Sequence, residues 1–270
     1  MLQATLALAQ RVERMEIEFC ALLARAGEAG GGAALEVGAG MAVGAAPGSP
    51  MNKVLGLGLG CSVTDEDLDA IELFYDDREC PIQIELCPLV STDLVAKLQA
   101  RGYVLKGFEN ELACTMPSIM PPSHGARVET LIGDRDEDVW LRVTSEGFAV
   151  PDASSVTEPP SMETIATVGG IMRQFIHPDI TRYLAWIDGE PASAAVSALS
   201  NGVLGIFGTA TRPAYRRRGL QSDILGRVLQ DAVGRADLAI ATTEPGSISQ
   251  RTFERFGFQV LYTRAILVRS

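Results

Sequence analysis

The sequence predicts an α/β (α+β) protein with two similar domains, each a mixed, mostly antiparallel sheet flanked by helices. Three observations support this. Strand and helix patterns alternate along the chain, a glycine-rich strand pattern occurs twice, and a proline-rich segment separates two halves. We therefore expect domains over residues 1–116 and 127–270, joined by a linker over 117–126.

The first half opens with apolar residues at helical spacing over 3–26, interrupted by charges, which predicts an amphipathic helix. Three acidic residues follow Thr64, and this pattern predicts that Thr64 is the N-cap of a later helix. The other expected elements are, in order, a weak strand over 35–43, a strand over 53–59, a helix over 64–77, a strand over 82–87, a helix over 91–100 ended by Gly102, and one or two strands over 103–114.

In the second half, Asp188-Gly189 lies between two strand-like runs and predicts a hairpin. The other expected elements are, in order, a strand over 128–132, helices over 137–145 and 161–177, hairpin strands over 181–187 and 191–197, a strand over 203–210, a helix over 219–234, a strand over 238–242, a helix over 247–256, and a final pair of strands to 270.

An internal repeat links the two halves. VLGLGLG at 54–60 resembles VLGIFGT at 203–209, and RGY at 101–103 resembles FGF at 256–258. A helix, a strand and a helix separate the two patterns in each half. Chance matching of glycine-rich strands is the alternative, but the shared order favours two similar domains.

Composition narrows the classes of partner. The net charge of −11 and a pI near 4.7 argue against a nucleic-acid or anionic-membrane surface. The five cysteines are scattered without a C-x-x-C pair, and charges interrupt every long apolar stretch. We expect a cytoplasmic protein with no disulfide framework, and two histidines are too few to predict a metal site.

The strongest local signal is TATRPAYRRRGLQS at 209–222, followed by an amphipathic helix. Arg212 and the run Arg216–Arg218 crowd the turn that opens this helix, and Gly219 allows the backbone to approach a ligand closely. The N-terminus of a helix offers unpaired N–H groups and a partial positive charge, which suits a diphosphate. The alternative is a solvated, charged helix cap.

This turn resembles the signature Arg/Gln-x-x-Gly-x-Gly/Ala of the GNAT superfamily of N-acetyltransferases, with Gln221 in place of the last small residue. SQRTFERFGF at 249–258 also resembles the later helix and Gly-Phe turn of that family. The resemblance covers 128–270 well and 34–115 in outline. It implies acetyl-CoA as the acetyl donor and no metal. The coenzyme-binding residues that it implies are Thr209, Ala210, Thr211, Arg216, Arg217, Arg218, Gly219, Leu220, Gln221 and Ser222.

The catalytic groups are less clear from the sequence. The family often has a tyrosine that acts as the general acid at the position of Phe253. Phenylalanine cannot donate a proton. Tyr262 is the substitute that we expect as the acid, and Glu244 is the candidate base. A packing tyrosine and a simple loop carboxylate are the alternatives. In the first copy, Asp65–Asp67 occupy the corresponding turn and would repel phosphate, which predicts a degenerate domain without a coenzyme site.

The expected function is therefore transfer of an acetyl group from acetyl-CoA to an amine by direct attack. The acceptor is expected to be a small-molecule or peptide amine, with no nucleic-acid or membrane partner and a possible homodimer. Two alternatives are an acyl-CoA-binding sensor without turnover and a scaffold made of degenerate copies of the fold, although the intact arginine turn disfavours the scaffold.

Overall fold

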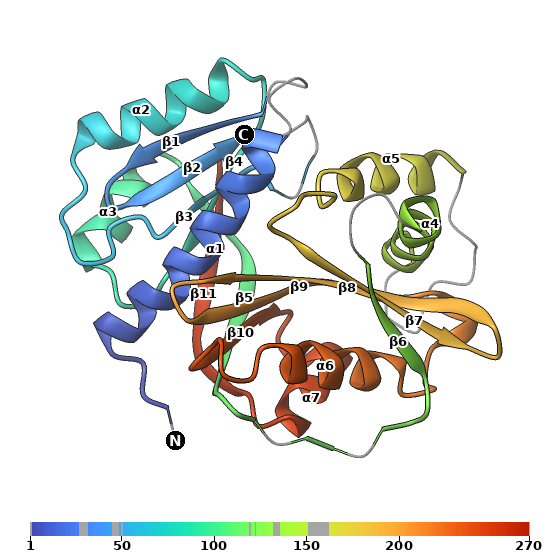
Figure 1. Ribbon diagram of the computed structural model, residues 1–270. Helices are drawn as coiled ribbons and strands as arrows, with labels where there is room; N and C mark the ends of the chain where they lie inside the picture. The colour runs from blue at the N-terminus through green and yellow to red at the C-terminus, as the bar shows by residue number, and fades with distance from the viewer. Residues whose placement is uncertain are drawn as a thin grey trace. The chain divides into compact units, whose positions relative to one another are not determined.

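The computed structural model describes residues 2–26, 32–44, 49, 51–118, 120–121, 123–131, 136–150 and 162–269 (Figure 1). The chain divides into two compact units. The first comprises 1–113, 242–245 and 259–270, and the second comprises 114–241 and 246–258. This division corrects the expected boundaries, because 242–245 and 259–270 belong to the first unit and the predicted linker lies within the second. Pro122 of that linker, the stretch 27–31, Ile132, Ser161 and Ser270 lie outside the described residues.

In the first unit, the sheet has the strand order β1-β2-β3-β4-β11-β5, and β3 and β4 are parallel. The weak strand expected near 35–43 is instead a hairpin, because Gly38 and Ala39 both have positive φ and form a tight turn. The elements of this unit are α1 (Leu6–Ala26), β1 (Ala33–Val37), β2 (Gly40–Gly44), β3 (Lys53–Leu55), α2 (Asp65–Asp76), β4 (Ile82–Leu86), α3 (Thr92–Ala100), β5 (Val104–Thr115) and β11 (Gln259–Arg269).

In the second unit, the strand order is β10-β9-β8-β7-β6, with β9 and β10 parallel. Helices α4 and α5 cover one face of this sheet, and α6 and α7 lie on the other (Figure 1). The elements are β6 (Arg127–Leu131), α4 (Glu137–Phe148), α5 (Met162–Arg173), β7 (Thr181–Ile187), β8 (Glu190–Ser200), β9 (Val203–Thr211), a 3-10 turn (Pro213–Tyr215), α6 (Leu220–Asp231), β10 (Leu238–Thr243) and α7 (Ile248–Arg255). No helix among the described residues has the length and apolar character needed to cross a membrane.

The predicted repeat is present in the structure. The series β3-α2-β4-α3-β5 in the first half of the chain matches β9-α6-β10-α7-β11 in the second. Each series begins with an antiparallel strand pair and continues with a parallel one, at β2/β3/β4 and at β8/β9/β10. Gly102 and Gly257, which follow α3 and α7, both have a φ of 86°. The two halves therefore fold by the same local rules.

The C-terminal segment differs from the expectation. It forms one long strand, β11, rather than a pair, and it lies between β4 and β5 of the first unit. Ala265 on β11 packs against the apolar core under α2 and α3. Because side chains alternate along a strand, its neighbour Arg264 points to the opposite face.

Arg264 is the centre of a buried group of charges, the Arg264 cluster, which consists of Arg264, Lys53, Glu13, Glu16, Glu85 and Glu111. The Arg264 side chain is 0% exposed. Its Nε lies 2.9 Å from Glu13 Oε1, and its Nη1 lies 2.5 Å from Glu16 Oε2 and 2.8 Å from Glu111 Oε1. Lys53 Nζ lies 2.9 Å from Glu16 and 3.1 Å from Glu85. The cluster thus joins α1, β3, β4, β5 and β11.

Two cations face four buried carboxylates, and the carboxyl pKa values diverge. Burial would raise the pKa of Glu16, but Arg264 and Lys53 lower it to about 2. Burial raises the pKa of Glu13 and Glu111 despite the nearby Arg264. Beside the cluster, burial and then the charge of Glu85 raise the pKa of Glu109 to about 7. The carboxyl groups around Arg264 therefore differ in how strongly they hold a proton, with Glu16 the most acidic of them.

The pKa of Glu109 predicts how the stability of the first unit depends on pH. A carboxyl group with a raised pKa in the folded state stabilises the fold below its unfolded pKa, and this contribution is lost as the pH rises toward 7. Glu109→Gln should match the wild type near pH 4.5 and exceed its stability at pH 8. Hydrogen exchange of β5 and β11 amides, compared between variant and wild type at each pH, measures the difference. Glu36→Gln, at an exposed residue of β1, is the control. Equal differences at both pH values would refute the prediction.

Candidate functional site

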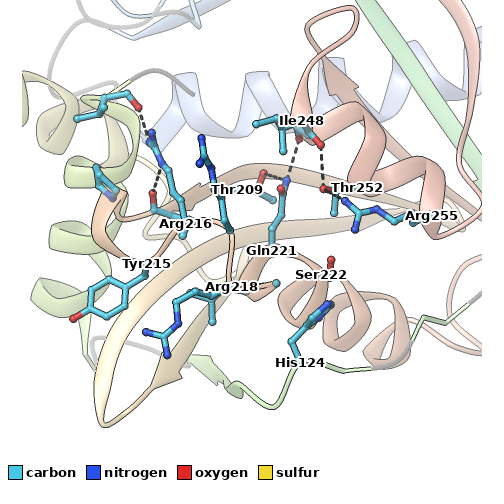
Figure 2. A pocket seen from close by; sticks show the side chains of 17 residues that line it. His124, Thr209, Tyr215, Arg216, Arg218, Gln221, Ser222, Ile248, Thr252 and Arg255 are labelled. Atoms are coloured by element: carbon cyan, nitrogen blue, oxygen red, sulfur yellow. Dashed lines mark hydrogen bonds between the residues drawn. The ribbon is translucent and has the colours of Figure 1, made fainter. Parts of the chain in front are cut away.

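A cavity of 910 Å³ in the second unit surrounds the N-terminus of α6 (Figure 2). The structure brings most of the predicted residues together there. Its lining residues are His124, Val150, Thr209, Thr211, Pro213, Tyr215, Arg216, Arg217, Arg218, Gly219, Leu220, Gln221, Ser222, Ile248, Ser249, Thr252 and Arg255. Ala210 is the one predicted coenzyme-binding residue that does not line it, because its side chain is buried and its carbonyl accepts a hydrogen bond from Ser193.

The helix N-terminus is open to a ligand. Gly219, the N-cap residue, has a φ of 77°, and no side chain caps this end of the helix among the described residues. The first N–H groups of an α-helix have no partner within the helix. Leu220, Gln221 and Ser222 therefore present donors at the positive end of the helix dipole. This arrangement has the free donors and the partial positive charge that an anion requires.

The strand that leads into this turn also exposes backbone. The parallel pairing of β9 with β10 runs from Val203 to Gly205, and the rest of β9 continues past it. Gly208 has a φ of 54°, and the register of β9 against β8 shifts there. This irregularity is a β-bulge. Thr209, within the bulge, and Thr211, beyond it, line the cavity.

The arginines of the turn serve two purposes. Arg216 faces inward, where its Nη2 donates to the carbonyls of Gly147 and Val150 at 2.9 and 2.6 Å. Arg216 therefore ties the turn to the end of α4, and two backbone carbonyls engage its guanidinium. Arg212 is likewise engaged, with Nε 2.6 Å from Glu146 Oε2.

Arg217 and Arg218 are exposed at the cavity, as is Arg255 from α7. Arg218 lies 2.6 Å from Asp188 Oδ2, but Asp188 is 72% exposed. An exposed ion pair contributes about 1 kcal/mol or less, so an anionic ligand can displace it. These three guanidinium groups gather positive charge at one place in an acidic chain.

His124 is a lining residue that sequence reasoning missed. Its ring lies directly over Gly219, since a Cβ built on that glycine would come within 2.2 Å of the ring. Asp223, in the first turn of α6, holds the segment in place: it accepts hydrogen bonds from the backbone N–H groups of His124 and Ala126 and from the Ser123 hydroxyl. His124 and Asp223 are 99 positions apart, so no local pattern connects them.

Gln221 replaces the small residue of the GNAT signature and spans the cavity. Its Nε2 donates to Ser249 Oγ at 3.0 Å and lies 3.4 Å from Thr209 Oγ1. Figure 2 shows its side chain between β9 and α7, among the residues that line the cavity. The departure from the signature therefore places a polar bridge inside the site.

The two predicted catalytic residues are not among the described residues that line this cavity. Glu244 is exposed after β10. Tyr262 belongs to the first unit, where its hydroxyl is buried and donates to Glu13 Oε1 at 2.8 Å. Burial also raises the pKa of the Tyr262 hydroxyl above its usual range. This placement argues against the predicted acid role, because a general acid must reach the leaving group.

The corresponding end of α2 in the first unit is closed to anions. Thr64 Oγ1 accepts from Asp67 N, and Asp67 Oδ2 accepts from Thr64 N, which makes a capping box. Asp65 and Glu66 add negative charge to the same turn. The two copies of the fold thus carry opposite charge at the same position.

The protein has an α/β fold, and the open N-terminus of α6 with its arginines has the charge and the donors that suit an anion. Residues 151–258 match the family described as the acetyltransferase (GNAT) family. The chain therefore carries a domain of the GNAT family, which confirms the resemblance read from Arg216–Gln221 and from 249–258. A comparison with curated proteins found no match.

Solved structures support the tandem fold. A GCN5-related N-acetyltransferase from Kribbella flavida is 18% identical with a TM-score of 0.67, over 97% of this chain and 95% of that one. A tandem GNAT protein from the clavulanic acid biosynthesis pathway is 12% identical with a TM-score of 0.58, over 99% and 96%. A GCN5-related N-acetyltransferase from Sphaerobacter thermophilus is 17% identical with a TM-score of 0.53, over 80% and 71%. The likeness to the first two of these structures covers nearly all of the chain and shows that the fold resembles theirs.

Proposed function

We propose that this protein is an N-acetyltransferase that binds acetyl-CoA in the cavity at α6 and transfers the acetyl group to an amine. The observation that carries the proposal is the uncapped N-terminus of α6, with exposed arginines around it, inside a GNAT-family domain. Membership of this family implies an acyl-CoA donor.

The residues of the cavity suit the parts of the coenzyme. The diphosphate would accept hydrogen bonds from the N–H groups that open α6, and Arg217, Arg218 and Arg255 would offer further donors to phosphate. The pantetheine arm would run along Thr209 and Thr211, where β9 has left its parallel partner. Arg216 contributes by holding the turn against α4.

The reaction needs no covalent enzyme intermediate. The amine nitrogen would attack the thioester carbonyl carbon, the C–S bond would break, the amine would lose one proton, and the thiolate of the coenzyme would gain one. A backbone N–H on β9 would stabilise the oxyanion that forms during attack.

An acyl-CoA sensor without turnover is the second candidate. Phe253 favours the sensor, because this residue occupies the position of the tyrosine that acts as the general acid in the family. Its ring packs edge-on against Phe258, with ring centroids 5.0 Å apart. The position is therefore filled by a residue of the apolar core that cannot donate a proton.

Release of free thiol from acetyl-CoA, measured with a panel of small amines and peptides, separates the two candidates. The acetyltransferase proposal expects release with at least one acceptor and none from a Gly219→Val variant. Coenzyme binding without release across the panel would favour the sensor, and the absence of both binding and release would refute both.

Gln221 provides a prediction about affinity. If the coenzyme arm passes along β9, it must displace the Gln221 bridge, so Gln221→Ala should bind coenzyme A more tightly. Since a typical hydrogen bond contributes about 0.5–1.5 kcal/mol net, the expected gain is roughly twofold to tenfold. Titration calorimetry measures it, and Ser249→Ala, which removes one end of the bridge, should show a smaller gain. Weaker binding by Gln221→Ala would mean that Gln221 contacts the coenzyme directly.

A further inference from the structure

A second cavity, of 320 Å³, lies within the first unit beside α1. Gln10, Glu13, Arg14 and Ile17 form one wall, and their spacing places them on one face of the helix. The opposite wall consists of Ala39, from the β1–β2 turn, and Gly56 and Leu59, which follow β3. None of these residues lines the cavity at α6.

The carboxylate of Glu13 has one oxygen engaged and one oxygen without a partner. Oε1 accepts hydrogen bonds from Tyr262 Oη at 2.8 Å and Arg264 Nε at 2.9 Å. Oε2 is buried and has no hydrogen-bond partner among the described residues. The residue as a whole is 1% exposed. A buried carboxylate oxygen left in this state costs about 1–3 kcal/mol or more, which a donor from a ligand would recover.

A group of opposite charge lies one position further along the helix. Arg14 is exposed, so its guanidinium can meet a ligand carboxylate with two parallel hydrogen bonds. The cavity therefore offers a carboxylate and a guanidinium on neighbouring residues of one wall.

The rest of the lining is apolar and small. Ile17 and Leu59 supply apolar surface, and both are largely buried. Gly56 has a φ of 67°, and a Cβ there would lie 2.7 Å from Ile17 Cδ1, so a larger residue would intrude on this wall. Space for an apolar group thus lies next to the two charged side chains.

We propose that this cavity binds a small zwitterion of the α-amino acid class. The ligand ammonium donates to Glu13 Oε2, its carboxylate accepts from Arg14, and its side chain packs against Ile17 and Leu59. A simple amine lacks a partner for Arg14, and a simple acid lacks a donor for Glu13 Oε2. The site is independent of the proposed acetyl transfer, because the binding needs no coenzyme.

Calorimetry without coenzyme tests the proposal with L-leucine, leucinamide, which lacks the carboxylate, and N-acetyl-L-leucine, which lacks the ammonium. L-leucine should bind with one site per chain and at least tenfold more tightly than either blocked compound. Glycine, L-alanine and L-phenylalanine extend the panel in size. Failure of all four amino acids to bind at millimolar concentration would overturn the proposal, as would equal affinity for leucine and its blocked forms.

Variants of α1 provide the matched control. Arg14→Gln should weaken leucine binding at least tenfold and abolish the preference for leucine over leucinamide. Arg25→Gln changes another exposed arginine of the same helix, away from the cavity, and should leave binding unchanged. Both positions are exposed, so neither variant should disturb the fold. Equal loss in both variants, or no loss in Arg14→Gln, would overturn the proposal. These outcomes do not bear on acetyl-CoA binding at α6.

Discussion

Gly219→Val is expected to abolish coenzyme binding, with a loss of at least about 100-fold in affinity. The residue has a φ of 77°, a conformation that costs a β-branched residue about 1–3 kcal/mol. A Cβ there would also lie 2.2 Å from the His124 ring, which Asp223 and the segment before β6 hold in place. The new side chain would cover the N–H groups that the diphosphate needs. Titration with coenzyme A measures the loss.

Gly234 provides a matched control for backbone strain. It follows α6 with a φ of 76°, and a Cβ there would meet nothing within 4 Å. Gly234→Ala should therefore lower thermal stability by backbone strain alone and keep wild-type affinity. Gly219→Ala adds the contact with His124 to the same strain, so it should lower stability more and weaken coenzyme binding. If both variants keep wild-type affinity, the coenzyme site is not at this turn.

Arg264→Met should destabilise the first unit by about 3–5 kcal/mol, the range for removing one partner of a buried ion pair. Glu13, Glu16 and Glu111 would lose the cation that they share, although methionine fills much of the same volume. Because Arg264 lies on β11, the loss should appear first as faster hydrogen exchange in β11 and in the neighbouring strands β4 and β5.

Arg101 is the matched control for this prediction. It also faces several carboxylates, at 3.0 Å from Asp65 and 2.6 Å from Asp69, but those partners are 66% and 68% exposed. Surface ion pairs contribute about 1 kcal/mol or less, so Arg101→Met should have a small effect. A loss in Arg264→Met no larger than in Arg101→Met would contradict the account of the cluster.

The turn that opens α6 could be predicted because its signal is local. A strand, a turn with Gly219 and an amphipathic helix follow one another between Val203 and Asp231, and the backbone of that segment carries the donors. The repeat was predictable for the same reason, since each copy follows the same order of short-range patterns. In the first copy, the acidic residues after Thr64 correctly indicated the helix start that the capping box closes.

The features that the sequence did not reveal all depend on contacts between distant residues. Arg264 lies in a strand of alternating polar and apolar residues. Nothing in that pattern indicates that its side chain is bound by Glu13, 251 positions away. β11 belongs to the first unit because it pairs with β4, and the residue pattern of β11 itself does not indicate which strand it pairs with. The hydrogen bond from Tyr262 to Glu13, which lies 249 positions away, also has no local signal in the sequence.

Arg216 shows a finer limit of sequence reasoning. Its position in the GNAT signature suggested a phosphate contact, but the carbonyls of Gly147 and Val150 take its guanidinium. Those acceptors lie at the end of α4, beyond the reach of any local pattern. The motif correctly identified the turn, while the direction of one side chain depended on tertiary packing.

Hydrogen–deuterium exchange with and without coenzyme A tests the central claim most directly, because the claim concerns particular backbone N–H groups. Binding at the N-terminus of α6 predicts slower exchange in a peptide covering 217–225 and no change in a peptide covering 64–70, which contains the equivalent turn of the first unit. Coenzyme binding that leaves 217–225 unprotected, or that protects 64–70 instead, would contradict the account.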